Sequence, residues 1–329
     1  MRRILLTAPA NFARHPLRSL SELAKRLLLI LLITLIASFF GAPKAQANPT
    51  PFQNGDVFAS VGNGQVKRFN SAGTLIDTLD TTTNSTATAG TCFDAVGNFY
   101  VTDFNAQKVS KFNKMGALVA ASFGSGYNAD PESCVVDTSG NIFVGQADGS
   151  HQILKFGSSG NLIASYAPAI ESRGTDWITP TSDQCTMFYT SEGGSVKRFN
   201  VCTNTQLADF ASGLSGPCYA LRIRANSEVL VACTSQVYRL SSSGAVLQTY
   251  LRSAYTESGT LFALNLDPDG TSFWTGGLES GNVYKIDIAS GNKLLSFNTG
   301  TSLLGGLAIF GEATPPLFYR VMLPLILKR

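Results

Sequence analysis

Four carboxylates recur at one kind of position, a few residues after a short apolar run, and their chemistry is the most definite in the chain. Carboxylate oxygens bind hard divalent cations and accept hydrogen bonds from basic or hydroxylated ligands. If they share one rim of the fold, they form a binding site for such a cation or ligand; otherwise they keep exposed turns soluble. Beyond that cation we expect no cofactor. The four residues are Asp103, Asp148, Glu192 and Glu279.

Nucleophilic catalysis has little support in the residue types. After residue 47 the chain has a single histidine, His151, in a segment rich in turn-forming residues. A serine nucleophile needs a base such as histidine beside it, and one turn histidine does not identify such a pair. We therefore predict no catalytic residues and lean towards a protein that is not an enzyme.

An internal repeat of about 43 residues indicates which elements position these side chains. Each copy ends a short strand with a basic residue, an apolar residue and a turn former, and a Gly follows three or four residues later in five of six copies. In the fourth copy Asn204 replaces the Gly, and Asn also adopts the left-handed conformation at low cost. The apolar residues are 43, 44, 43, 41 and 46 positions apart; they are Phe69, Phe112, Phe156, Phe199, Leu240 and Ile286.

Two more apolar runs precede this strand in each copy. Residues 93–101 and 136–144 show them joined by an Asp-x-x-Gly-Asn turn, which is typical of a hairpin. Each copy is therefore predicted to be four antiparallel strands, a to d, with strand d of the fourth copy at residues 207–210. Six such units predict an all-β, six-bladed β-propeller over residues 56–311. The first unit lacks strand a, and residues 305–311 are expected to supply it and close the ring.

The segment before the ring has the pattern of a targeting sequence. A basic stretch from Arg2 to Arg26 precedes an apolar run of 14 residues, 27–40, and the small-residue pattern 45–47. This predicts a signal peptide over 1–47, with cleavage before Asn48, or alternatively a retained N-terminal anchor. Residues 48–55 then lead into the ring. We expect a secreted or cell-surface protein.

Charge argues against nucleic acid as a partner. The first 47 residues hold seven of the 25 basic and one of the 22 acidic residues, so the remainder carries 18 basic and 21 acidic residues. Nucleic-acid binding requires many Lys and Arg on the folded part.

Residues 312–329 form a hydrophobic C-terminal tail that contains prolines. This tail either packs on the ring or is read by a sorting machinery. Contact with a membrane is expected only through the leader or a sorted tail.

The six cysteines lie in the exported part, and an even number there predicts disulfides. No CxxC spacing occurs, which argues against a zinc site. Cys185 and Cys202 fall in turns of the fourth unit on the same rim, and Cys218 and Cys233 flank a hairpin of the fifth. Cys92 and Cys134 remain, at the start of strand a in adjacent units. The alternative is buried free thiols.

The turn and strand pattern resembles NHL-type six-bladed propellers and is similar to senescence-marker/gluconolactonase-like and virginiamycin-lyase-like repeat proteins. This resemblance implies the fold over about 250 residues. Gluconolactonase-like enzymes hold a divalent cation through an early Glu, two Asn and an Asp. This chain has no Glu between residues 23 and 131, so the resemblance does not carry over an active site.

The function that we expect is that of a monomeric binding or interaction module without catalysis, with a protein, glycan or small molecule as ligand. The alternative is a metal-dependent lactonase- or lyase-like hydrolase of the gluconolactonase-like group. A third possibility is a structural envelope protein without a ligand.

Overall fold

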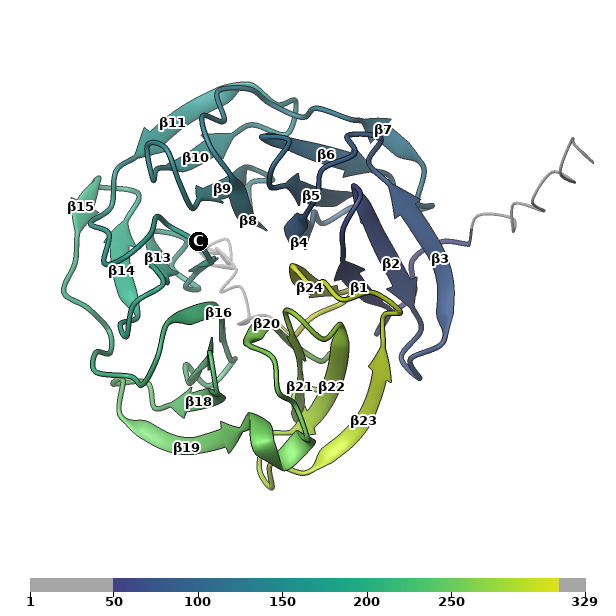
Figure 1. The fold of residues 1–329 in the computed structure, drawn as a ribbon. Helices are drawn as coiled ribbons and strands as arrows, with labels where there is room; N and C mark the ends of the chain where they lie inside the picture. The colour runs from purple at the N-terminus through teal and green to yellow at the C-terminus, as the bar shows by residue number, and fades with distance from the viewer. Residues whose placement is uncertain (1–49, 314–329) are drawn as a thin grey trace, which may run out of the picture. The chain divides into compact units, whose positions relative to one another are not determined.

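A computed structural model describes residues 50–313, which form six four-stranded antiparallel sheets arranged in a ring (Figure 1). The predicted leader, residues 1–47, and all of the predicted tail 312–329 except residues 312 and 313 lie outside the described residues. Within the described part, the one helical segment is the single 3-10 turn η1 (Arg252–Tyr255), and no helix is long and apolar enough to cross a membrane. The chain is a six-bladed β-propeller.

Each blade runs from an inner strand a at the channel to an outer strand d at the edge of the ring. The first three blades are β24 (Gly306–Ile309), β1 (Val57–Ser60), β2 (Gln65–Phe69), β3 (Leu75–Asp80); β4 (Thr88–Phe93), β5 (Phe99–Asp103), β6 (Lys108–Phe112), β7 (Leu118–Ala120); and β8 (Pro131–Val136), β9 (Ile142–Gln146), β10 (Ile153–Phe156), β11 (Leu162–Tyr166). The last three are β12 (Ile178–Pro180), β13 (Thr186–Tyr189), β14 (Lys197–Asn200), β15 (Thr205–Gln206); β16 (Cys218–Ile223), β17 (Val229–Cys233), β18 (Gln236–Leu240), β19 (Val246–Leu251); and β20 (Leu261–Leu266), β21 (Ser272–Gly277), β22 (Asn282–Asp287), β23 (Lys293–Asn298).

The ring closes as the repeat predicted. β24, the last strand in the sequence, pairs antiparallel with β1, the first, and joins Ile309 to Val57 and Gly306 to Ser60. The first blade therefore takes its inner strand from the end of the ring. This pairing removes the open sheet edge that a linear array of blades would leave.

The core lies between neighbouring blades. Strand b is fully buried in most blades, for example in β5 and β17, because each sheet is covered on both faces. The outer strands β3 and β23 are mostly exposed. A single four-stranded sheet would leave one apolar face in water, so the blades depend on one another for burial.

The turns between strands c and d have the geometry that the sequence indicated. Glycines 73, 116, 160, 244 and 291 have φ angles between 75° and 88°, and Asn204 has φ 53° in the same place of the fourth blade. Only Gly, and at a modest cost Asn, adopts this region readily.

The fourth outer strand differs from the prediction. We expected strand d at residues 207–210, but regular pairing is confined to β15. The following residues are held by isolated backbone hydrogen bonds and by one antiparallel bridge, between Val196 and Ala211. The Asp209 carboxylate lies 3.2 Å from Lys197 Nζ, so an ion pair also links this segment to β14.

The six cysteines form three disulfides, in the pairs expected from the sequence. Cys185–Cys202 joins two turns of the fourth blade, and Cys218–Cys233 joins directly opposed residues of β16 and β17. Cys92–Cys134 joins the inner strands β4 and β8 of adjacent blades. Disulfides of this number fit an oxidising compartment.

Candidate functional site

The inner strands surround a central channel with two ends. One end, which we call the a–b mouth, is formed by the turns between strands a and b, such as 94–98 and 137–141. The other, the b–c mouth, is formed by the turns between strands b and c, such as 147–152 and 190–196, and by the connections that lead from one blade to the next. The two mouths carry different chemistry.

Three carboxylates converge at the b–c mouth. Glu132 lies near the start of β8, Asp176 lies two residues before β12, and Glu192 follows β13. One carboxylate oxygen from each lies within 4.8 Å of the others. Glu132 is 2% exposed and Asp176 is 0% exposed, so two of the three acids are inside the protein. We call these three residues the acidic cluster.

Close backbone packing places Asp176 in this cluster. The N–H groups of Gly174 and Thr175 donate to the carbonyls of Ala147 and Gln146, at 2.8 and 3.0 Å. A Cβ on Gly174 would lie 2.1 Å from the Gln146 carbonyl oxygen, so only glycine permits this approach. The next residue, Trp177, is buried against the ring of Phe262. The connection is therefore held on both sides of Asp176.

Arg173 is the basic residue beside the acidic cluster. Its guanidinium donates to both oxygens of Asp148, at 3.1 and 2.5 Å, and to Oε1 of Glu192 at 3.3 Å. It also lies over the ring of Phe104. The backbone N–H of Arg173 bonds to the Ser191 carbonyl, which fixes the guanidinium beside the turn that carries Glu192.

The two buried acids at this mouth have raised pKa values. Burial, followed by the charge of Glu192, raises the pKa of Glu132 to about 8. Burial, followed by the charge of Glu132, raises the pKa of Asp176 well above its usual range. The hydrogen bonds from Arg173 lower the pKa of Asp148. Both oxygens of Asp176 and Oε2 of Glu132 are buried with no hydrogen-bond donor among residues 50–313.

The four carboxylates singled out in the sequence separate into two groups. Asp148 and Glu192 come together around Arg173, and Glu192 belongs to the acidic cluster. Asp103 is buried and accepts hydrogen bonds from hydroxyls, including those of Thr81 and Ser110, and burial raises the pKa of Asp103. Glu279 accepts from the N–H and the hydroxyl of Thr260. Neither Asp103 nor Glu279 belongs to the acidic cluster.

His151 is half-buried in the b–c turn of the third blade. Its Nδ1 lies 2.9 Å from the carbonyl oxygen of Ala147, in the same turn. This local contact orients the ring and occupies one of its two nitrogens.

Glu132 and Asp176 were not identified from the sequence. The sequence did contain one signal for Glu132. It is the single acidic residue of β8 (Pro131–Val136), an inner strand whose other residues are apolar or small. Asp176 lies just before the equivalent strand of the next blade. Acidic side chains are rarely fully buried unless they are paired, so Glu132 and Asp176 are candidates for a functional site.

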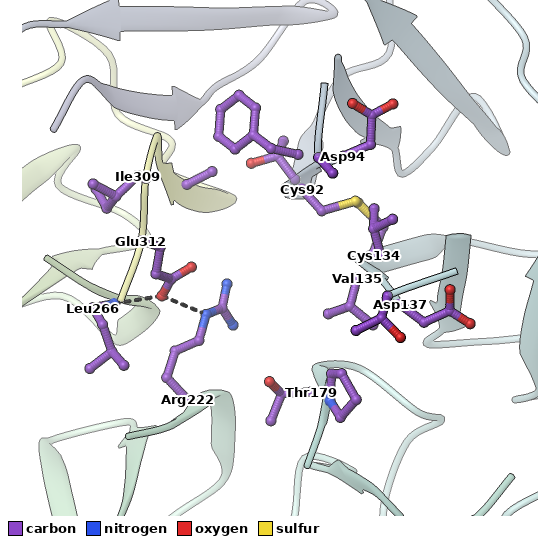
Figure 2. A pocket seen from close by; sticks show the side chains of 18 of the residues that line it. Cys92, Asp94, Cys134, Val135, Asp137, Thr179, Arg222, Leu266, Ile309 and Glu312 are labelled. Atoms are coloured by element: carbon purple, nitrogen blue, oxygen red, sulfur yellow. Dashed lines mark hydrogen bonds and ion pairs between the residues drawn. A yellow bond between two sulfur atoms is a disulfide. The ribbon is translucent and has the colours of Figure 1, made fainter. Parts of the chain in front are cut away.

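A cavity of about 510 Å³ opens at the a–b mouth (Figure 2). The Cys92–Cys134 disulfide, Val135 and Ile223 contribute apolar surface, while Thr138 contributes polar surface at the turns. This volume lies within the range of small-molecule sites.

An ion pair projects into this cavity. Glu312 accepts hydrogen bonds from Arg222 Nε at 2.9 Å, from Asn265 Nδ2 at 2.9 Å and from the Leu266 N–H at 2.6 Å. Arg222 Nη1 donates to the Leu221 carbonyl, and Nη2 has no hydrogen-bond partner in the described part of the chain. Figure 2 shows the guanidinium beside Glu312, within the ring of lining residues.

Comparisons with solved structures agree on the fold. The chain is similar to a structure titled "Crystal structure of Nidogen/Laminin Complex", with a TM-score of 0.62 and 13% identity over 77% of this chain and 97% of that one. It is also similar to a protein of unknown function from Bacteroides caccae, with a TM-score of 0.60 and 12% identity over 78% and 98% of the two chains. A streptogramin B lyase gives a TM-score of 0.51 and 14% identity over 65% and 69%.

No protein-family model and no curated protein matches the sequence. At these identities the structural likeness shows the six-bladed propeller alone. Propellers of different function share this ring, so the function has to be argued from the two mouths.

Proposed function

We propose that this chain is an exported binding module that holds its ligand in the cavity of the a–b mouth without turnover. The cavity is the observation that carries the proposal, because it is large enough for a small molecule or for the end of a protein or glycan chain. The comparisons leave both binding proteins and lyases among the structural neighbours.

The lining indicates what the ligand would present. The disulfide, Val135 and Ile223 offer an apolar surface, and beside it Arg222 Nη2 offers a donor that no group of residues 50–313 accepts. A ligand with an apolar group and an acceptor oxygen, such as a carbonyl or carboxylate, matches both features. Interblade strands and an interblade disulfide make up the walls, so the site is largely preformed and little order is lost on binding.

Export rests on the predicted leader, and the three disulfides support it. Disulfides persist in oxidising compartments and are rare in the cytosol. An exported protein with a preformed cavity is suited to capturing a ligand outside the cell.

A fragment screen tests this function. Ligand-observed NMR on the purified protein is expected to give hits that disappear when Thr138→Trp fills the cavity, because Thr138 is exposed and lines it. Ser139→Trp is the matched control, since Ser139 is the exposed neighbour that does not line the cavity. Hits that survive Thr138→Trp would place binding elsewhere and contradict the proposal.

A metal-dependent lactonase- or lyase-like enzyme is the second candidate, and the acidic cluster of the b–c mouth is the observation that favours it. A lactone-hydrolysis assay with added calcium distinguishes the two. Lactone hydrolysis by the wild type that is lost in Glu132→Gln would support the enzyme and contradict the binding module.

A further inference from the structure

The acidic cluster has hydrogen-bonding capacity that the described protein groups do not meet. Both oxygens of Asp176 and Oε2 of Glu132 are buried and lack a donor within residues 50–313. An ionised carboxylate buried without a partner is strongly unfavourable, so such a group either takes up a proton or binds a cation. Because these orphan oxygens belong to the residues that converge with Glu192, the cluster is built to receive a positively charged group from outside the chain.

The donor set selects a hard cation. One oxygen from each acid lies within 4.8 Å of the others, and Ca²⁺–O distances of about 2.3–2.6 Å allow one ion to contact all three. Zinc favours His nitrogen and Cys sulfur, but the cluster contains neither, and the six cysteines are all in disulfides. Oxygen ligands alone are typical of calcium and magnesium sites.

We propose that Glu132, Asp176 and Glu192 bind one calcium ion at the b–c mouth. Arg173 donates to Oε1 of Glu192, which leaves the other oxygen of that carboxylate for the ion. Water or an oxygen atom of an external molecule completes the coordination, since Ca²⁺ takes six to eight oxygen ligands. The ligands come from the third and fourth blades, so the site differs from the early-Glu set that the gluconolactonase resemblance implies.

The site lies at the opposite end of the channel from the proposed ligand cavity. Calcium binding is therefore expected to be unchanged in Thr138→Trp, which fills the a–b mouth. A failure of calcium binding would therefore not contradict ligand binding in the a–b cavity, and the reverse also holds.

Calorimetric titration tests the site directly. The purified full-length protein is freed of metal with EDTA, passed into chelator-free buffer and titrated with CaCl₂, and separately with MgCl₂. We expect one calcium per chain, weaker magnesium binding, and a thermal midpoint that rises with calcium concentration. Asp176→Asn and Glu132→Gln are each expected to weaken calcium binding about tenfold or more, since each removes one charged ligand.

Glu279→Gln is the matched control. It removes a carboxylate from a b–c turn of the sixth blade that is outside the acidic cluster, so calcium affinity is expected to equal that of the wild type. The wild type failing to bind calcium at millimolar concentration would overturn the proposal. Undiminished binding in folded Asp176→Asn would also overturn it, and Glu132→Gln gives the same test if Asp176→Asn does not fold.

Discussion

The two ends of the channel handle buried charge in opposite ways. On the a–b side, two carboxylates each pair with one guanidinium: Asp56 pairs with Arg68, and Glu312 pairs with Arg222. At the b–c mouth, five carboxyl groups of the described chain act on one guanidinium; they are Asp130, Glu132, Asp148, Asp176 and Glu192.

This difference separates stability from binding. An ion pair that is complete within the chain stabilises the fold only if both partners remain, because loss of one leaves a buried charge. A cluster with surplus acid instead strains the fold until a cation arrives. Substitutions that remove a carboxylate should therefore have opposite effects at the two ends.

The largest effect is expected on the a–b side, at Asp56. Asp56→Asn leaves the Arg68 guanidinium buried, 2% exposed, without its anionic partner. The free energy of unfolding should fall by about 3–5 kcal/mol. Urea unfolding measures this, with Asp77→Asn on the exposed face of β3 as the control that should change little. An unchanged urea midpoint in Asp56→Asn would show that the Asp56–Arg68 ion pair does not stabilise the fold.

Next in size is the disulfide that joins two blades at the a–b mouth. Replacing Cys92 and Cys134 by Ser removes a link between residues 42 positions apart, and the cost should be about 2–4 kcal/mol. The Cys185–Cys202 link spans only 17 residues, so its removal should cost about 1 kcal/mol less. Denaturant midpoints of the two double variants measure this order. Free-thiol titration of the denatured wild type should find none, and six would remove the disulfides altogether.

The acidic cluster should respond in the opposite direction. In EDTA, Asp176→Asn replaces an orphan oxygen by an amide that can donate to Glu132, so the free energy of unfolding should rise by about 1–2 kcal/mol. In saturating calcium the wild type should be more stable than Asp176→Asn, because it gains binding energy that the variant lacks. Thermal unfolding in both buffers measures the sign. A lower midpoint of the variant in EDTA would remove the contrast between the two ends.

The smallest effect concerns Glu228, in the a–b turn of the fifth blade, which pairs with Arg239 and Arg224. The hydrogen bonds from Arg239 lower the pKa of Glu228 from 4.5 to about 2. A carboxyl group whose pKa is lowered by folding adds stability at pH values above its unfolded pKa, here 4.5. This stability is lost as the pH falls through the folded pKa of about 2. Glu228→Gln should therefore cost about 0.5–1 kcal/mol at pH 7 and almost nothing below pH 2.

Unfolding of wild type and Glu228→Gln at both pH values checks this prediction. Glu279→Gln is the control, since Glu279 has no ion-pair partner within residues 50–313. A cost that persists at low pH would mean that Glu228 acts through packing instead of charge.

The ring could be predicted because its determinants are local and repeated. The turn glycines and Asn204 fix the link between strands c and d in each blade, and the spacing of the basic-apolar pairs sets the number of blades. Closure followed from one missing strand and one spare strand. Cys218 and Cys233 oppose each other once the hairpin register is set, so their pairing also followed from local structure.

The candidate sites depend on positions that the repeat does not encode. Asp148 and Glu192 were chosen for their place in the turns, but Glu132 and Asp176 were missed, because acidic residues occur in many solvated turns and only burial sets these two apart. Arg222 and Glu312 come together from positions 90 residues apart in the sequence.

The amino-acid sequence by itself determined the blade and the number of blades, since these follow from turn conformation and strand register over a few residues. It also predicted the disulfide partners, two pairs from local turns and strands and Cys92–Cys134 because these two cysteines remained. Tertiary structure alone decided which side chains share the channel. The inner strands of all six blades converge there, and burial at that convergence raises the pKa values of Glu132 and Asp176 and leaves carboxyl oxygens without a donor in residues 50–313.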